Sequence, residues 1–188
     1  MDPAVTAALI AAPVAVIAAS AAFAAGIVQG RGAQRGPVDA VRQEHQRDAY
    51  ASFLAALHAY ERGIDPSRCT KRAEAELRRT ATSWTSTDLH ARTLELAAEI
   101  PIEEILSAQA MVELQGPDIH VVDASVIAVG LVSEAHFAAA VAYGGPDAAI
   151  SDFLSSYDKL YPARRQFTLA ARAALYGGEY TPDPSVTW

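Results

Sequence analysis

The chain has 188 residues, a formal net charge of −7 and a single cysteine, Cys69. One cysteine excludes an intramolecular disulfide and agrees with a reducing compartment. The acidic balance, with no aromatic side chains interleaved among the basic ones, argues against a nucleic-acid-binding protein.

Residues 3–30 contain no charged side chain, although 20% of the chain is charged. A helix crosses a bilayer with about 20 mostly apolar residues. The larger apolar side chains of this run favour insertion by about −3 to −5 kcal/mol together. We therefore expect a transmembrane helix over residues 1–30. A cleaved secretory signal is disfavoured because no Lys or Arg precedes the run, and a helix buried in the protein's own core is the remaining alternative.

Basic residues follow this run, beginning with Arg31 and Arg35, and none precedes it. The positive-inside rule then places the N-terminus outside the cell membrane and the rest of this single-pass chain in the cytoplasm. Small residues repeat at four-residue spacing at Ala18, Ala22 and Gly26. Such a pattern lets two membrane helices approach closely, so the span is a candidate surface for self-association.

A basic, glycine-rich hinge is expected over residues 31–36, followed by a helical domain over residues 37–176. Apolar residues at three- and four-residue steps predict a first helix from Pro37 to a break at residues 63–67. The positions assigned to its inner face are Val38, Val41, His45, Ala49, Phe53, Ala56, Leu57 and Tyr60.

The next helix is expected to begin near Ser67 or Thr70 and to run through Leu77. Six Ser or Thr residues between positions 80 and 87 weaken its register. A restart capped by Thr87 or Asp88 follows, because Thr and Asp side chains accept hydrogen bonds at helix N-termini.

Pro101 suits the first turn of another helix, and the Gly-Pro pair at 116–117 ends it. Residues 118–143 are rich in Val and Ile, which also suit a strand, but their length and the alanines after position 135 favour a helix. In the helix after Pro101, the apolar positions expected to share a face are Ile102, Ile105, Leu106, Ala110, Met111 and Leu114. In residues 118–143 the expected face is Ile119, Val122, Val126, Val129 and Ser133, broadened by Ile127, Leu131, Ala135 and Ala138.

Residues 144–147 form an expected turn before a last helix. Pro162 should kink or restart that helix, since proline donates no backbone hydrogen bond. The Gly-Gly pair at 177–178 ends the helix, and residues 177–188 are expected to form a flexible tail.

Charge is segregated along the chain. Residues 31–92 sum to +3, residues 93–158 carry eleven acidic and no basic side chains, and residues 159–188 sum to +2. We expect the acidic middle helices to pack against the basic first and last ones. The alternative is an acidic docking face for a basic partner.

A cluster of basic residues lies on the second predicted helix. Together with Arg31 and Arg35 it is assigned to a membrane-proximal surface that contacts anionic lipid headgroups. A solvated helix face is the alternative explanation. The members of the cluster are Arg68, Lys71, Arg72, Arg78 and Arg79.

Three histidines precede an acid by three positions: His45, His58 and His120. This order is the reverse of the Glu-x-x-His pattern of di-iron bundles. Local ion pairs or hydrogen bonds explain these spacings, and no serine-hydrolase elbow or phosphate-binding loop occurs. We therefore predict no catalytic residue, no cofactor and no metal site.

Several segments resemble a loose group of uncharacterised small actinobacterial membrane-anchored helical proteins. The similar segments are the uncharged N-terminal run with its Gly-Arg hinge, residues 42–53 (RQEHQRDAYASF), residues 112–117 (VELQGP) and residues 167–175. The resemblance implies a membrane-tethered helical bundle and assigns no catalytic residues.

The sequence thus predicts an all-α protein with an N-terminal transmembrane helix and an antiparallel bundle of about four helices. The expected function is that of an interaction or scaffold module, not an enzyme, with membrane lipid and a protein partner or a second copy as ligands. Two alternatives remain: a membrane-active effector that assembles through its Ala-rich helix, and a soluble ligand-binding bundle that buries its N-terminal helix.

Overall fold

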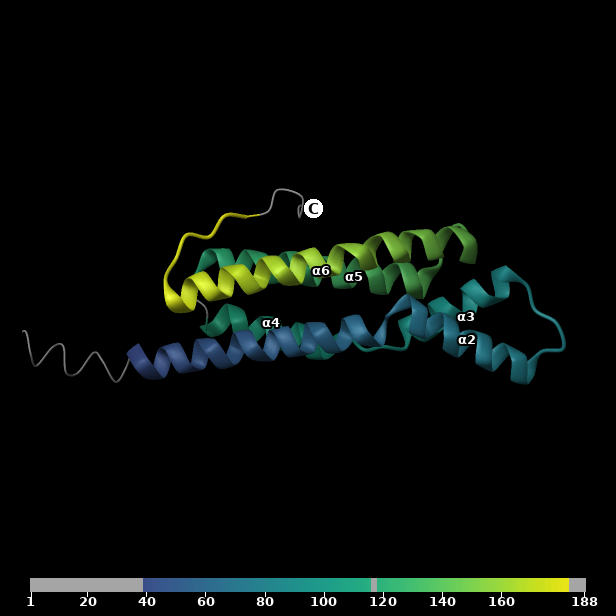
Figure 1. Ribbon diagram of the computed structural model, residues 1–188, viewed down its shortest axis with the longest axis horizontal. Helices are drawn as coiled ribbons and strands as arrows, with labels where there is room; N and C mark the ends of the chain where they lie inside the picture. Colours follow the sequence, from purple (N-terminus) through teal and green to yellow (C-terminus); the bar gives the residue numbers. More distant parts are fainter. Residues whose placement is uncertain (1–38, 116–117, 183–188) are drawn as a thin grey trace, which may run out of the picture. The chain divides into compact units, whose positions relative to one another are not determined.

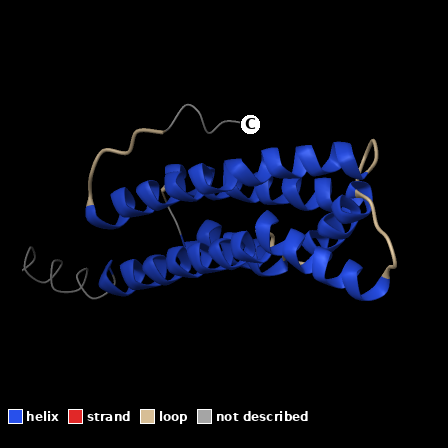
Figure 2. Ribbon diagram, turned by 45° about the vertical axis from the view of Figure 1, so that its right-hand side comes forward, coloured by secondary structure: helices blue, strands red, loops and turns tan. Residues whose placement is uncertain are grey.

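The computed structural model describes residues 39–115 and 118–182, which contain six helices and no strand (Figures 1 and 2). The predicted transmembrane helix over residues 1–30 and the hinge over residues 31–36 lie outside the described residues, as do Ala18, Ala22, Gly26, Arg31 and Arg35. The chain divides into two units, residues 1–44 and 45–188. Residues 39–44 of the first unit are helical, and all other described residues belong to the second unit.

Helical backbone is first described over residues 39–63. It is followed by α2 (Pro66–Thr80), α3 (Ser86–Ala98), α4 (Glu103–Gln115), α5 (Ile119–Val141) and α6 (Pro146–Tyr176). The all-helical prediction is confirmed. The described helices outnumber the expected four, because the interruptions predicted near residues 63–67, 80–87 and 101 are complete helix breaks, at residues 64–65, 81–85 and 99–102.

Two helices begin earlier than the sequence suggested, because the capping residues lie upstream of those predicted. The Asp65 carboxylate accepts a hydrogen bond from the Arg68 backbone N–H at 3.1 Å, so α2 begins at Pro66. Thr85 forms a reciprocal capping box with Asp88, in which each side chain accepts from the other residue's backbone N–H. Thr85 is therefore the N-cap of α3, and Asp88 occupies the third helical position, where it completes the capping box.

The α5 segment is one continuous helix of 23 residues, which settles the choice between helix and strand. Its buried face agrees with the predicted one in part: Leu131 and Ala135 are buried as predicted, whereas Ile119 is 63% exposed and Val126 is also exposed. Small residues occupy the buried face because they allow the neighbouring helix to approach closely. The residues buried along α5 are Val121, Ala124, Ser125, Ala128, Leu131, Val132, Ala135 and Ala139.

The face predicted for α4 is also wrong in part. Leu106, Met111 and Leu114 are exposed, whereas Ala108 and Val112 are buried with Ile105. In the first helix Val41 and His45 are exposed, while the positions from Ala49 onward are buried or partly buried as predicted.

The last helix continues through Pro162 without a restart. Proline removes one backbone hydrogen bond and costs about 3 kcal/mol inside a helix. Leu160, Ala163 and Phe167 are fully buried on either side of Pro162, so packing on both sides outweighs this cost.

The centre of the bundle lies where the first helix packs against α5 and α6. The α5 and α6 helices are antiparallel neighbours joined by residues 142–145, and α3 contacts both (Figure 1). The Phe53 and Phe167 rings lie 4.6 Å apart between centroids, and Tyr50 meets Phe167 edge to face at 6.0 Å. After α6, Tyr180 of the predicted tail packs against the core, with its ring 5.4 Å from that of His120.

Candidate protein-binding surface

The turn between α5 and α6 is built from residues with left-handed backbone. Ala142 ends α5 at φ 46°, and Gly144 and Gly145 follow at φ 76° and 91°. A Cβ atom on Gly144 would lie 3.2 Å from the Ala148 Cβ, so glycine meets both the conformational and the steric demand. The chain thereby reverses within four residues and brings the end of α5 beside the start of α6.

A hollow of about 340 Å³ lies beside this turn, and we call it the turn groove. Phe137 is 54% exposed and Tyr143 is 71% exposed, with their ring centroids 5.8 Å apart. Buried Ala149 and Ser156 form part of its lining. The complete lining is Glu134, Phe137, Ala138, Tyr143, Ala149, Asp152, Ser155, Ser156 and Lys159.

The charged groups of the turn groove make no ion pair with any other residue that the structure describes. Within the described residues, neither Glu134 nor Asp152 makes an ion pair, and Lys159 on the same rim makes none. Exposed aromatic rings beside unpaired carboxylates are suited to binding apolar and basic side chains of a protein.

Asp147, at the start of α6, belongs to a different local arrangement. Its carboxylate is 2.7 Å from His90 Nδ1 and accepts a hydrogen bond from the Thr87 hydroxyl at 3.0 Å. These hydrogen bonds, that with His90 first, lower the pKa of Asp147 below its ordinary value. The cluster connects the beginning of α3 to the beginning of α6.

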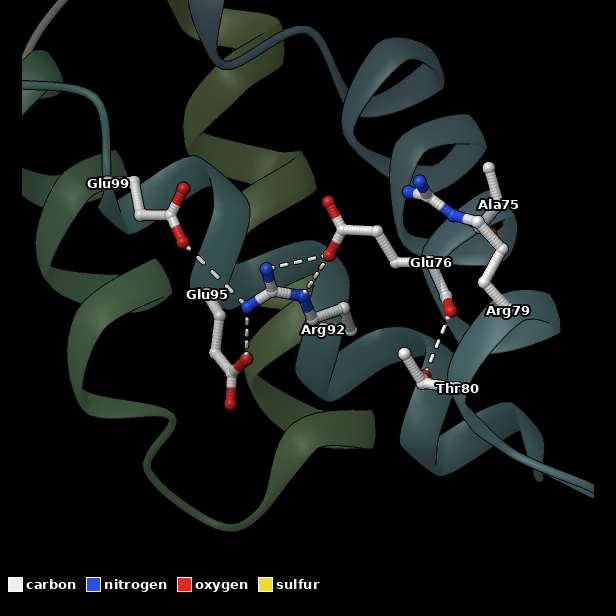
Figure 3. Close-up of polar contacts among 7 residues, drawn as sticks. All are labelled: Ala75, Glu76, Arg79, Thr80, Arg92, Glu95 and Glu99. Carbon is white, nitrogen blue, oxygen red and sulfur yellow. Dashed lines mark hydrogen bonds and ion pairs between the residues drawn. The ribbon is translucent and has the colours of Figure 1, made fainter.

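The five basic residues predicted on the second helix all lie on α2 and are exposed. Arg78 pairs with Glu74 on the same helix. Arg79 Nε donates to the Ala75 carbonyl at 3.2 Å, and both residues are labelled in Figure 3. Lys71 and Arg72 make no ion pair within the described residues.

Arg92 differs from these because three carboxylates surround its guanidinium group (Figure 3). It lies 2.7 Å from Glu76 of α2 and from Glu95, and 3.7 Å from Glu99. The hydrogen bonds to Glu95 and Glu76 raise the pKa of Arg92. These contacts engage the Arg92 guanidinium group and join α2 to α3.

A second internal ion pair lies near the bundle centre. Arg164 Nε donates to the mostly buried Glu61 carboxylate at about 3 Å, and its guanidinium lies 5.2 Å from the Tyr161 ring centroid. The three-residue spacing suggested that Glu61 pairs with His58, but Glu61 pairs with Arg164 of α6 instead.

The single cysteine, Cys69, is buried, and burial raises the pKa of its thiol. The thiol donates a weak hydrogen bond to the Gly63 carbonyl.

The acidic middle segment faces outward. Ten of its eleven acidic residues are exposed. Within the described residues, its ion pairs to the flanking segments involve only Arg92 and His90. The expected packing of acidic middle helices against basic outer ones therefore does not account for the arrangement. Apolar burial at the helix contacts does.

Within the described part of the chain, no group of three or more His, Cys, Asp or Glu residues could hold a metal ion. One described helix, α5, is long and apolar enough to cross a membrane by length and composition, a test that the core helix of a soluble protein also passes.

Sequence reasoning missed Phe137 and Tyr143, because both lie in a strongly apolar segment, in which exposed rings do not stand out from buried side chains. The alanines at 128, 135 and 139 share a helix face that excludes Phe137, and this spacing was the available signal. Comparisons with protein-family models, with curated proteins and with solved structures found no match.

Proposed function

We propose that this protein is a membrane-anchored interaction module whose helical bundle binds a protein through the turn groove. The observation that carries the proposal is the exposed pair of rings, Phe137 and Tyr143, beside carboxylates without ion-pair partners. Exposed aromatic side chains of this kind dominate the binding energy of many protein interfaces. The proposed activity is binding and not catalysis.

The anchor in this proposal is the uncharged run at residues 3–30, with the N-terminus outside and the bundle in the cytoplasm. Support comes from its length and from the arginines that follow it. Membrane lipid is then one ligand of the chain, and Ala18, Ala22 and Gly26 are proposed to let two spans associate.

Cell fractionation tests the anchor. We expect the intact chain to stay in the membrane pellet after an alkaline carbonate wash, and a variant that lacks residues 1–30 to become soluble. Recovery of the intact chain in the soluble fraction without detergent contradicts the anchor.

Site-specific photo-crosslinking in the native cell tests the binding surface. A photoreactive residue at position 137 or 143 should crosslink to a protein in a defined band. The same residue at position 176, where Tyr176 is 73% exposed at the far end of α6, should not. Equal crosslinking from all three positions contradicts a specific surface.

A further inference from the structure

We propose that the turn groove binds the basic face of α2 from a second copy of this chain. This inference rests on the proposed function and names its partner. Two exposed surfaces of opposite charge on the same chain carry it, and no ion pair joins them within the described residues.

The α2 basic face consists of Arg68, Lys71, Arg72 and Arg79, all exposed. Steps of three, four and seven residues place these side chains along one side of the helix. At 1.5 Å per residue the row is about 16 Å long. Arg78 lies at its edge and is already paired with Glu74, so it is left out of the proposed contact.

The turn groove offers the groups that such a row requires. Guanidinium groups lie favourably over aromatic rings, and the pair Phe137 and Tyr143 presents two such rings. The chain makes the same type of contact internally, between Arg164 and Tyr161. Glu134 and Asp152 supply carboxylates for the remaining cations, and these two acids outnumber the single basic residue of the lining, Lys159.

Contact between two different surfaces is head to tail, so each copy leaves one surface open for the next. A row of copies held on one membrane is the expected product. This arrangement makes the association sensitive to salt, because exposed charges are screened within about 8 Å at physiological ionic strength.

Charge reversal on the full chain in detergent micelles tests the inference. One variant carries Glu134→Arg with Asp152→Arg, and the other carries Lys71→Glu with Arg72→Glu. Energy transfer between donor-labelled and acceptor-labelled chains reports association. We expect each variant alone to associate about tenfold more weakly than the wild type at low salt, and an equimolar mixture of the two variants to recover the association.

A control variant carries Glu113→Arg with Asp123→Arg, which changes the net charge equally at exposed acids outside the turn groove. It should associate as the wild type does. The inference is overturned if this control weakens association equally, if neither charge-reversed variant weakens it, or if the mixture does not recover. It is also overturned if the α2 variant loses only binding to vesicles that contain anionic lipid.

The crosslinking experiment separates this inference from the proposed function. A specific crosslink from position 137 to a protein other than this chain overturns the second-copy inference and leaves the interaction module standing. Absence of any position-specific crosslink overturns both. A crosslinked band of twice the mass of the chain supports both.

Discussion

The bundle centre and the α5–α6 turn contain the same kinds of side chain in opposite environments. At the centre, Phe53 and Phe167 are fully buried, and the nearby Glu61 carboxylate is paired with Arg164. At the turn, Phe137 and Tyr143 are exposed and the neighbouring carboxylates have no ion-pair partner among the described residues. The difference indicates that burial of apolar side chains at the centre stabilises the fold, whereas the side chains exposed at the turn contribute little to folding.

The largest expected effect comes from truncating one phenylalanine in each region. Phe167→Ala removes a fully buried ring that contacts Phe53 and Tyr50, and should lower the free energy of unfolding by about 3–5 kcal/mol. Phe137→Ala should change it by no more than about 0.5 kcal/mol. Equilibrium denaturation of both variants measures these values. Comparable losses in the two variants would remove the distinction between the regions.

The next effect compares two ion pairs. Glu61→Gln leaves the partly buried Arg164 guanidinium without its carboxylate and should lower the free energy of unfolding by about 1.5–3 kcal/mol. Glu74→Gln breaks the exposed pair with Arg78 on α2 and should cost about 0.3–0.5 kcal/mol. Denaturant titration of both variants provides the comparison. A Glu61 variant no weaker than the Glu74 variant would show that the central pair contributes no more than a surface one.

A smaller effect concerns the start of α3. Thr85→Ala removes the hydroxyl that accepts from the Asp88 backbone N–H and should lower stability by about 1 kcal/mol. Thr82→Ala, in the loop before the cap, is the matched control and should leave the unfolding midpoint unchanged. If the two variants unfold alike, the capping box does not stabilise the helix.

The helices could be predicted from the sequence because their apolar residues recur with helical spacing and because Gly and Pro mark most breaks. The caps at Asp65 and Thr85 were missed, since several neighbouring Ser, Thr and Asp residues are equally good candidates from type alone. The buried faces of α4 and α5 were assigned wrongly in part, for a different reason. A helix apolar on several sides does not reveal which side meets its neighbours, and the small residues decided it.

The candidate surface was less predictable than the fold. The basic row on α2 followed from spacing, because residues three, four and seven positions apart on a helix lie on one side of it in any tertiary structure. The turn groove brings together Glu134 of α5 and Asp152 of α6, and their proximity depends on how the two helices pack. Whether an acid finds a basic partner is likewise a tertiary property, as Glu61 shows by pairing with a residue 103 positions away.

The smallest expected effect is the pH dependence that Asp147 confers where the turn meets α3. Hydrogen bonds from His90 and Thr87 lower its pKa below the ordinary value of 3.8, so the folded state holds the ionised carboxylate more strongly than the unfolded state does. The stability from this cluster is therefore present above the unfolded pKa and is lost as the pH falls through the lower folded pKa.

In denaturation series between about pH 7 and pH 2, the stability difference between the wild type and Asp147→Asn should be constant above about pH 5 and shrink below about pH 4. Hydrogen bonds with Thr85 also lower the pKa of Asp88. Because Asp88 is present in both proteins, its contribution cancels in the stability difference. The same measurement in a His90→Phe background should give a smaller difference. If the pH-dependent stability difference is undiminished in the His90→Phe background, the contact between His90 and Asp147 is not the source of that difference.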